Sequence, residues 1–381
     1  THNQDTIYAA QIIELFINEK YRIPSKNIYV EKIEDSPFDY DQMADYFASF
    51  FKKNPDLRKN AVNYISLTTG TPAETTNIAL RSMDLSVKYL YQPYGSKECK
   101  EIKLLSRLNR QKYASIIQEL INNYEYGSAL DIARESPYGS NFQLLTLLEV
   151  MRRRILFDFE GALKESKKIE STEKIIQGLV NDLSDLSKLN EKKILEELIY
   201  RVNLSFKKKD YLEGIALLFS LIDNFLQYQF KVATGKSIEK FEGEFKEFNQ
   251  FIQEKSYIED KKKYLNMPNR PNLREILSLI NKNESPIGGI DEIDSFINRL
   301  ERAEKIDGKE ISIFDLRNHG PYAHGNMGVT EELLKKLYPP YGGDGIINDL
   351  KECLKAIFHR LTENPFNTIN NLISAWLTQE C

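Results

Sequence analysis

Apolar positions in the first hundred residues alternate between two periodicities. Helical spacing runs over residues 6–19, 41–52 and 73–83, and short β-branched or aromatic runs lie at residues 27–30, 61–67 and 87–91. Strands that alternate with helices are typical of parallel βαβ units, so the pattern predicts an α/β fold with a doubly wound sheet over residues 1–100. Such a sheet normally opens with a strand, whereas this chain opens with a helix. We therefore expect that a leading strand is missing from the sequence.

Beyond about residue 101 the β pattern ends and helical spacing dominates. We expect helices at residues 211–232, 273–282, 290–303, 311–318 and 344–361, and a polar insertion at 235–274. Aromatic segments that each carry a small residue predict helical hairpins at 124–130, 157–163 and 209–217. The expected organisation is an α/β domain over residues 1–100, a helical linker over 101–205 and an all-helical domain over 206–381.

Composition narrows the classes of protein to which this chain can belong. Of its 381 residues, 41% are hydrophobic and 28% are charged, which is ordinary for a globular protein and excludes wholesale disorder. The formal net charge of -4 excludes a protein that coats nucleic acid through bulk positive charge, so any such contact must be local. The three cysteines, too few and too scattered for a disulfide framework or a zinc site, are Cys99, Cys353 and Cys381.

The sequence shows no membrane segment. The longest apolar stretch, residues 214–230, is interrupted by Asp223, Asn224 and two glutamines, so we expect a core helix there. The first five residues carry neither the basic nor the apolar region of a signal peptide. With no disulfide requirement either, we expect a cytoplasmic protein.

An unusual polar stretch follows the predicted helix at 311–318. Arg317 and Asn318 are followed directly by His319, and five residues separate Asn318 from His324. The chain has only four histidines, and two of them lie in this stretch. From the numbers of Arg, Asn and His in the chain, about 0.04 such matches are expected by chance. The alternative is a helix end capped by Gly320 and a surface turn, in which His324 is an ordinary polar residue.

The predicted strand at 61–67 runs directly into a small polar loop that consists of Thr68, Thr69, Gly70, Thr71 and Pro72. In open α/β sheets, ligands bind at the carboxyl ends of strands, and the N-terminus of a helix attracts phosphate. Gly70 lets a backbone approach closely, and the threonines supply hydroxyls. The absence of Gly-x-Gly-x-x-Gly and of a P-loop lysine disfavours dinucleotide or ATP binding. The alternative is a simple strand–helix turn with a threonine cap.

Both motifs match known families. Arg317-Asn318, five residues and then His324 on a late helix resembles the Arg-polar-x(4–6)-His motif of HEPN ribonucleases. The strand, Thr-Thr-Gly-Thr-Pro and helix look like the nucleotide-sensing loop of CARF domains. The order of the parts along the chain, first a CARF-like domain, then a helical linker and then a HEPN-like domain, is similar to that in the accessory ribonucleases of type III CRISPR systems. Cyclic oligoadenylates activate those ribonucleases. The resemblance implies a Rossmann-like CARF domain, a helical linker and a C-terminal HEPN domain.

The resemblance also implies the chemistry. HEPN ribonucleases cut single-stranded RNA without a metal, as homodimers, by attack of the ribose 2′-hydroxyl on the adjacent phosphate. Arg317 would hold the phosphate, His324 would exchange the proton, and Asn318 would position one of them. His319 is an extra histidine, so which of the two transfers the proton stays open.

In the resembled CARF domain, the loop formed by residues 68–72 would bind the cyclic oligoadenylate. Asn3, and more weakly His2, would face the same pocket. Whether the domain also opens the ring of the activator, with Thr69 or Thr71, stays open. No cofactor and no metal are expected.

Two other functions stay open. The first is a non-catalytic helical scaffold or adaptor whose nucleotide-sensing domain recruits a partner. The second is a nucleotide-binding transcriptional regulator, which the lack of a basic helix-turn-helix and the negative net charge disfavour.

Overall fold

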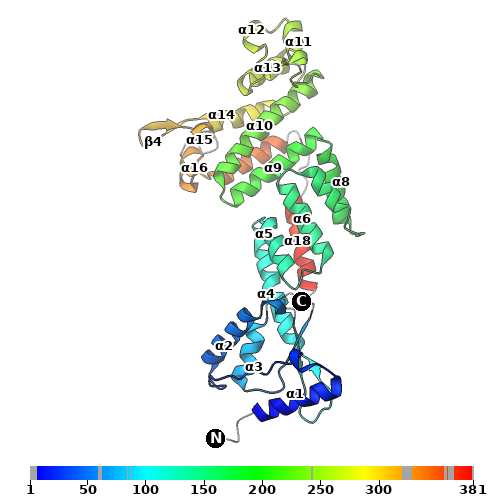
Figure 1. The fold of residues 1–381 in the computed structure, drawn as a ribbon. Helices are drawn as coiled ribbons and strands as arrows, with labels where there is room; N and C mark the ends of the chain where they lie inside the picture. The colour runs from blue at the N-terminus through cyan, green and yellow to red at the C-terminus, as the bar shows by residue number, and fades with distance from the viewer. Residues whose placement is uncertain are drawn as a thin grey trace. The chain divides into compact units, whose positions relative to one another are not determined.

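Figure 1 shows the computed structural model of the chain. It describes residues 7–58, 62–83, 85, 87–241, 243–319, 328–355, 358 and 364–379. Contacts between residues divide the described chain into two units. The first comprises the residues up to Ser115 together with Glu135–Tyr138, and the second comprises Ile116–Arg134 and Gly139–Gln379.

The first unit contains a three-stranded sheet. Its strands lie in the order β1 (Asn63–Ser66), β2 (Val87–Tyr91), β3 (Lys100–Glu101). β1 and β2 are parallel, with Asn63 opposite Val87, and α3 (Pro72–Arg81) connects them in a βαβ unit. The strands predicted at 61–67 and 87–91, and the helix between them, are confirmed. β3 pairs antiparallel with β2 and was not predicted, because two exposed charged residues give no strand pattern.

Two more helices belong to the described first unit, α1 (Ile7–Tyr21) and α2 (Tyr40–Lys53). Both were predicted from their apolar spacing. α2 lies beside α3 (Figure 1), and Met43, Phe47 and Ala73 form a small core between the two helices.

The strand expected at residues 27–30 is wrong. Ser25–Asn27 forms a 3₁₀ turn, and the next three residues belong to no helix or strand. Tyr29 is 88% exposed and Val30 is 42% exposed. A run with β propensity forms a strand only where a neighbour pairs its backbone and covers one face. No described residue does either here.

The described second unit is almost entirely helical. α4 (Lys103–Asn122) begins in the first unit and ends in the second. The helices that follow are α5 (Tyr126–Glu135), α6 (Phe142–Ile155), α7 (Phe159–Ser166), α8 (Lys174–Ser187), α9 (Glu191–Lys207), α10 (Tyr211–Thr234), α11 (Lys246–Glu254), α12 (Lys261–Tyr264), α13 (Arg270–Asn283), α14 (Ile290–Glu301), α15 (Ile313–His319), α16 (Glu331–Leu337), α17 (Gly343–Lys355) and α18 (Pro365–Gln379). A short hairpin, β4 (Glu304–Ile306) and β5 (Lys309–Ile311), precedes α15.

The helical hairpins share one backbone turn. In each, a non-glycine residue has a φ of 55° to 61°: Tyr124, Phe157, Leu189 and Lys209. Its N–H bonds to the carbonyl three residues back, and the next N–H bonds to the carbonyl five residues back, as in a Schellman motif. In three of the turns the next side chain then caps the following helix: Asp158, Asn190 and Asp210. The three predicted hairpins are confirmed, and the turn at Leu189 is an additional one.

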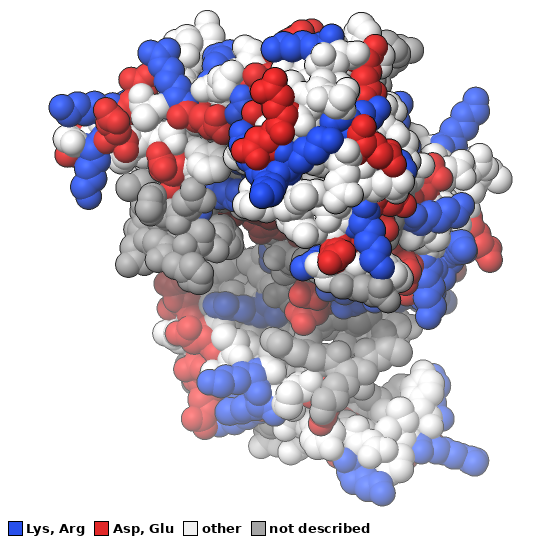
Figure 2. Space-filling model, turned by 90° about the horizontal axis from the view of Figure 1, so that it is seen from above, with Lys and Arg blue, Asp and Glu red and all other residues white. Residues whose placement is uncertain are grey.

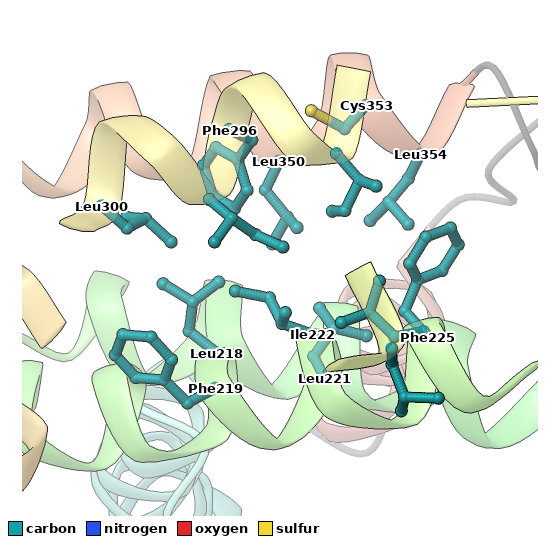
Figure 3. Packing of buried hydrophobic residues seen from close by; sticks show 14 of the residues in the cluster. Leu218, Phe219, Leu221, Ile222, Phe225, Phe296, Leu300, Leu350, Cys353 and Leu354 are labelled. Atoms are coloured by element: carbon teal, nitrogen blue, oxygen red, sulfur yellow. The ribbon is translucent and has the colours of Figure 1, made fainter. Parts of the chain in front are cut away.

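α10 lies at the centre of the core of the second unit. Figure 3 shows Leu218 and Ile222 of α10 facing Phe296 of α14 and Leu350 of α17. The stretch 214–230 is therefore a core helix, as predicted. None of the helices in the described ranges is long and apolar enough to cross a bilayer.

The C-terminal helix α18 was not predicted, because the expected last helix at 344–361 corresponds to α17. α18 packs against α6 and α8, far back in the sequence (Figure 1). The hydroxyl of Tyr124 donates to Asn367 Oδ1 at 2.7 Å, and that of Tyr126 donates to Asn370 Oδ1 at 2.8 Å. The domain boundaries at residues 100 and 205 stay a prediction.

Two glycines provide a matched test of this packing. A Cβ on Gly214 of α10 would lie 2.6 Å from the Phe206 ring, whereas a Cβ on exposed Gly178 of α8 would meet nothing within 4 Å. We expect Gly214→Ala to lower stability by about 1–3 kcal/mol through overpacking. Gly178→Ala should raise it by up to about 1 kcal/mol through helix propensity. Thermal unfolding midpoints measure both, and equal shifts would contradict the packing.

Candidate functional site

The hairpin that precedes α15 fixes where that helix begins. β4 and β5 pair antiparallel, with Glu304 opposite Ile311. The two residues between the strands, Asp307 and Gly308, have φ values of 48° and 80°. Positive φ at both central residues is the mark of a type I′ turn, for which Asp-Gly is a preferred sequence. This Asp-Gly pair was the sequence signal for a hairpin that helical spacing alone did not predict.

A reciprocal cap then starts α15. Ser312 Oγ accepts from the N–H of Asp315 at 3.1 Å, and Asp315 Oδ2 accepts from the N–H of Ser312 at 2.9 Å. Asp315 Oδ2 also accepts from Ser312 Oγ at 2.7 Å. This is a capping box in which Asp replaces the usual Glu, and it satisfies N–H groups that a helix start otherwise leaves free.

Apolar contacts hold the body of α15. Ile313 and Leu316 are fully buried. The ring of Phe314 packs edge-on against Phe219 of α10, with centroids 5.2 Å apart and an interplanar angle of 84°. Arg317 follows Phe314 by three residues, so the two side chains lie on the same face of α15 and both contact Phe219 of α10.

Arg317 is half-buried, and its Cζ lies 5.5 Å from the centroid of the Phe219 ring. Its guanidinium forms no hydrogen bond or ion pair with any residue that the structure describes. A guanidinium is charged at every physiological pH, and its planar fork matches a phosphate. The side chain is therefore placed to receive an anion.

The other residues of the motif are only partly described. Asn318 and His319 occupy the last two positions of α15. His324 lies outside the described residues, as does Asn3. Arg317 is thus the candidate catalytic residue whose surroundings the structure defines.

A second arginine lies at the same ring and was missed by sequence reasoning. The Cζ of Arg270, the first residue of α13, is 4.7 Å from the Phe219 centroid and 5.1 Å from the Phe314 centroid. Its Nε donates to Asp223 Oδ1 at 2.7 Å. Burial lowers the pKa of Arg270, and the charge of Arg317 lowers it further, against the opposing effect of Asp223. No local pattern marks Arg270, because its partners lie far away in the sequence.

The predicted threonine loop lies at the carboxyl end of β1. Thr68 Oγ1 accepts from the N–H of Gln92 at 2.9 Å, so the loop is tied to the segment that follows β2. Gly70 has a φ of 115°, which favours glycine. Thr68, Thr69 and Gly70 are exposed.

The N-terminus of α3 is already capped. Thr71 Oγ1 accepts from the N–H of Glu74 at 3.2 Å, and Glu74 Oε2 accepts from the N–H of Thr71 at 2.6 Å, while Pro72 fills the first helical turn. The hydroxyl of Thr71 also donates to the carbonyl of Pro37. The capping function that the sequence left as an alternative is therefore real for Thr71. The loop groups that remain for a ligand are those of Thr68, Thr69 and Gly70.

Charges elsewhere form no broad positive surface on the face in Figure 2, where Lys and Arg are interspersed with Asp and Glu. The described residues also contain no group of three or more His, Cys, Asp or Glu side chains that could hold a metal ion.

Comparison with known proteins identifies the fold. No family model matches the sequence, and no curated protein is similar to it. Among solved structures, Enterococcus italicus Csm6 bound to cyclic hexa-2′-fluoro-hexa-dAMP is similar with a TM-score of 0.61 and 15% sequence identity. The match covers 91% of this chain and 82% of that chain. The chain has the fold of this Csm6 structure.

This fold confirms the expected combination of an α/β part with a mostly helical part, and the β4–β5 hairpin is the departure from the all-helical second part that was expected. The threonine loop lies in the α/β part of the chain, and α15 with Arg317 lies in the helical part. Residues 68–72 thus lie at a strand–helix junction, and Arg317 and Asn318 lie on a late helix, whereas His324 is outside the described residues.

The cap of α15 can be tested by removing one carboxylate. We expect Asp315→Ala to lower stability by about 1 kcal/mol, because the hydrogen bonds that Asp315 Oδ2 accepts from the N–H and the hydroxyl of Ser312 are lost. Asp291→Ala is the control, since Asp291 is an exposed acid in the first turn of α14 with no capping role. Both substitutions remove an acid from a first helical turn, so Asp315→Ala should cost more than Asp291→Ala by the contribution of the cap. Thermal unfolding midpoints distinguish the two, and an equal or smaller loss for Asp315→Ala would contradict the capping box.

Proposed function

We propose that the protein is a metal-independent, single-strand endoribonuclease of type III CRISPR antiviral defence that a cyclic oligoadenylate activates. The observation that carries this proposal is the guanidinium of Arg317, which has no described carboxylate partner and stands in the Arg-Asn-x5-His sequence at the end of α15. The Csm6 fold supports the assignment, because Arg317 and Asn318 lie on a late helix of the helical part.

In the proposed reaction, the ribose 2′-hydroxyl attacks the adjacent phosphorus. The hydroxyl gives its proton to a base, the bond to the 5′-oxygen breaks, and that oxygen takes up a proton. The products are a 2′,3′-cyclic phosphate and a free 5′-hydroxyl. Arg317 neutralises the charge that builds on the phosphate oxygens, and His324 exchanges protons, with Asn318 and His319 as supporting groups.

One arginine and one or two histidines make a small site, so we propose that two subunits pair and bring two motifs together. The structure of a single chain is compatible with this arrangement, since Arg317 is half-buried and not enclosed by described carboxylates.

We propose further that the activator binds at the threonine loop. The solved Csm6 was bound to a cyclic hexanucleotide analogue, and the loop of this chain presents exposed Thr68, Thr69 and Gly70 at the carboxyl end of β1. Activation is then a population shift, in which the activator binds the active arrangement better than the idle one.

Cleavage of RNA tests the catalytic assignment. Purified protein with cyclic tetra- or hexa-adenylate should cut a labelled single-stranded RNA in the presence of EDTA. Arg317→Ala should lower the rate about a hundredfold or more, the usual cost of losing a group that stabilises the transition-state charge. Arg302→Ala is the control, because Arg302 is an exposed surface residue, with 75% side-chain exposure, paired with Glu304 at 3.1 Å.

The outcomes separate the rival functions. Cleavage that survives Arg317→Ala would show that the site is wrong while the activity is right. Binding of the activator without any RNA cleavage would favour the non-catalytic scaffold or adaptor instead.

The ligand-binding loop has its own test. A cyclic oligoadenylate carries several negative charges, and the Glu74 carboxylate lies at the N-terminus of α3 beside the exposed loop. Glu74→Gln keeps a residue that suits a capping box but removes the charge, so we expect about threefold tighter activator binding at low salt and a smaller gain at high salt. Calorimetry measures this, with exposed Glu19→Gln on α1 as the control. Unchanged affinity in Glu74→Gln would place the activator elsewhere.

A further inference from the structure

Arg270 is the most deeply buried charged group near Arg317. Its side chain is 6% exposed, and it lies against two aromatic rings that also hold α15 in place. Its Nη1 is buried and has no hydrogen-bond partner among the described residues. Because this atom is not accessible to solvent, Arg270 is not placed to touch an RNA phosphate itself.

The carboxylate that pairs directly with Arg270 is that of Asp223. Asp223 follows Phe219 by one turn of α10, so the two side chains share a face of the helix. Asp223 Oδ1 is 2.7 Å from Arg270 Nε, and the guanidinium carbons of both Arg270 and Arg317 lie within 5.5 Å of the Phe219 centroid. Asp223 and the two arginines are thus gathered around one ring, and Arg270 is the arginine with which Asp223 pairs.

We infer that Arg270 is a positioning residue that keeps Arg317 free by occupying Asp223. This rests on the proposed role of Arg317 as the phosphate-binding residue. Without Arg270, the half-buried Asp223 would gain by pairing with Arg317, because a carboxylate in a partly desolvated place favours the nearest guanidinium. An Arg317 that is already neutralised by a carboxylate binds phosphate poorly. Arg270, Arg317 and Asp223 together carry a net charge of one positive unit, and the pairing of Arg270 with Asp223 leaves that charge on Arg317, where it can bind the anion.

A purely mechanical role for Arg270 makes a different prediction. If Arg270 only held α13 against α10 and α15, its loss would loosen the site whether or not Asp223 carried a charge. If it kept Asp223 occupied, removal of the charge on Asp223 would reverse the loss. The two roles are therefore separated by a second substitution.

The experiment compares Arg270→Met with Arg270→Met/Asp223→Asn in the full-length chain. Phenylglyoxal, which modifies unpaired guanidinium groups, is used as the probe, and peptide mass spectrometry follows modification of Arg317. We expect modification about fivefold slower in Arg270→Met, the scale of one ion pair, and recovery to the wild-type rate in the double variant. Activator-dependent RNA cleavage should fall and recover in the same order.

Arg274→Met is the matched control on the same helix. Arg274 pairs with Asp294 at 2.7 Å and with Glu301 at 2.9 Å, but does not contact the Phe219 ring, so its loss should not slow modification of Arg317. Should Arg270→Met unfold, Arg270→Gln takes its place in the single and the double variant. Its neutral amide holds Asp223 more weakly than a guanidinium does, so modification of Arg317 should again slow in the single variant, by less than in Arg270→Met, and recover in the double variant.

Either of two results overturns the inference: modification of Arg317 at the wild-type rate in the single variant, or no recovery in the double variant. The modification rate needs no RNA cleavage. Absence of ribonuclease activity in the wild type would therefore contradict the proposed function, while the pattern of modification would still decide the role of Arg270.

Discussion

The arrangement of the candidate site depends on the packing around one ring, that of Phe219. The ring is 1% exposed in α10, and three side chains from other helices meet it: Phe314 and Arg317 of α15 and Arg270 of α13. These helices are separated by long stretches of sequence, so no local propensity brings them together. An aromatic ring accepts both an edge-on aromatic partner and a guanidinium, and it can therefore join apolar packing to positive charge at one point.

Partial exposure to solvent explains why Arg317 can carry its charge without a partner among the described residues of a packed helical unit. The mostly buried arginines of the second unit each pair with a carboxylate: Arg154 with Glu197, Arg201 with Glu213, Arg270 with Asp223, and Arg274 with Asp294. Such pairing offsets the cost of removing a charge from water. Arg317 differs from these arginines because it keeps part of its exposure to solvent. The aromatic ring under its guanidinium is a feature that it shares with Arg154, Arg201 and Arg270. The positive charge that remains available to an anion is thus that of Arg317, on the short capped helix α15.

Much of this fold could be predicted from the sequence, and the exceptions have physical causes. Helices such as α10 and α13 and the strands β1 and β2 each bury one face. Their apolar residues therefore recur with the period of the element, and the sequence of each segment alone is enough to predict it. The run at residues 27–30 has β propensity but lacks a described partner strand. The position of α18 depends on hydrogen bonds to Tyr124 and Tyr126, more than 240 residues earlier in the chain. Arg317 was predictable from its motif, whereas Arg270 and Asp223 were not, because their meaning lies in a contact between distant helices.

The threonine loop shows why a motif alone does not separate structure from function. Its three threonines look alike in sequence, yet the structure gives them different tasks. Thr71 caps α3 together with Glu74, Thr68 joins the loop to the N–H of Gln92, and Thr69 is exposed at the tip. A helix N-terminus that is already occupied by its own carboxylate has less to offer a phosphate than the bare motif suggests. Recognition of an anionic ligand here must therefore come chiefly from the exposed hydroxyls and from the backbone around Gly70, and must overcome the charge of Glu74.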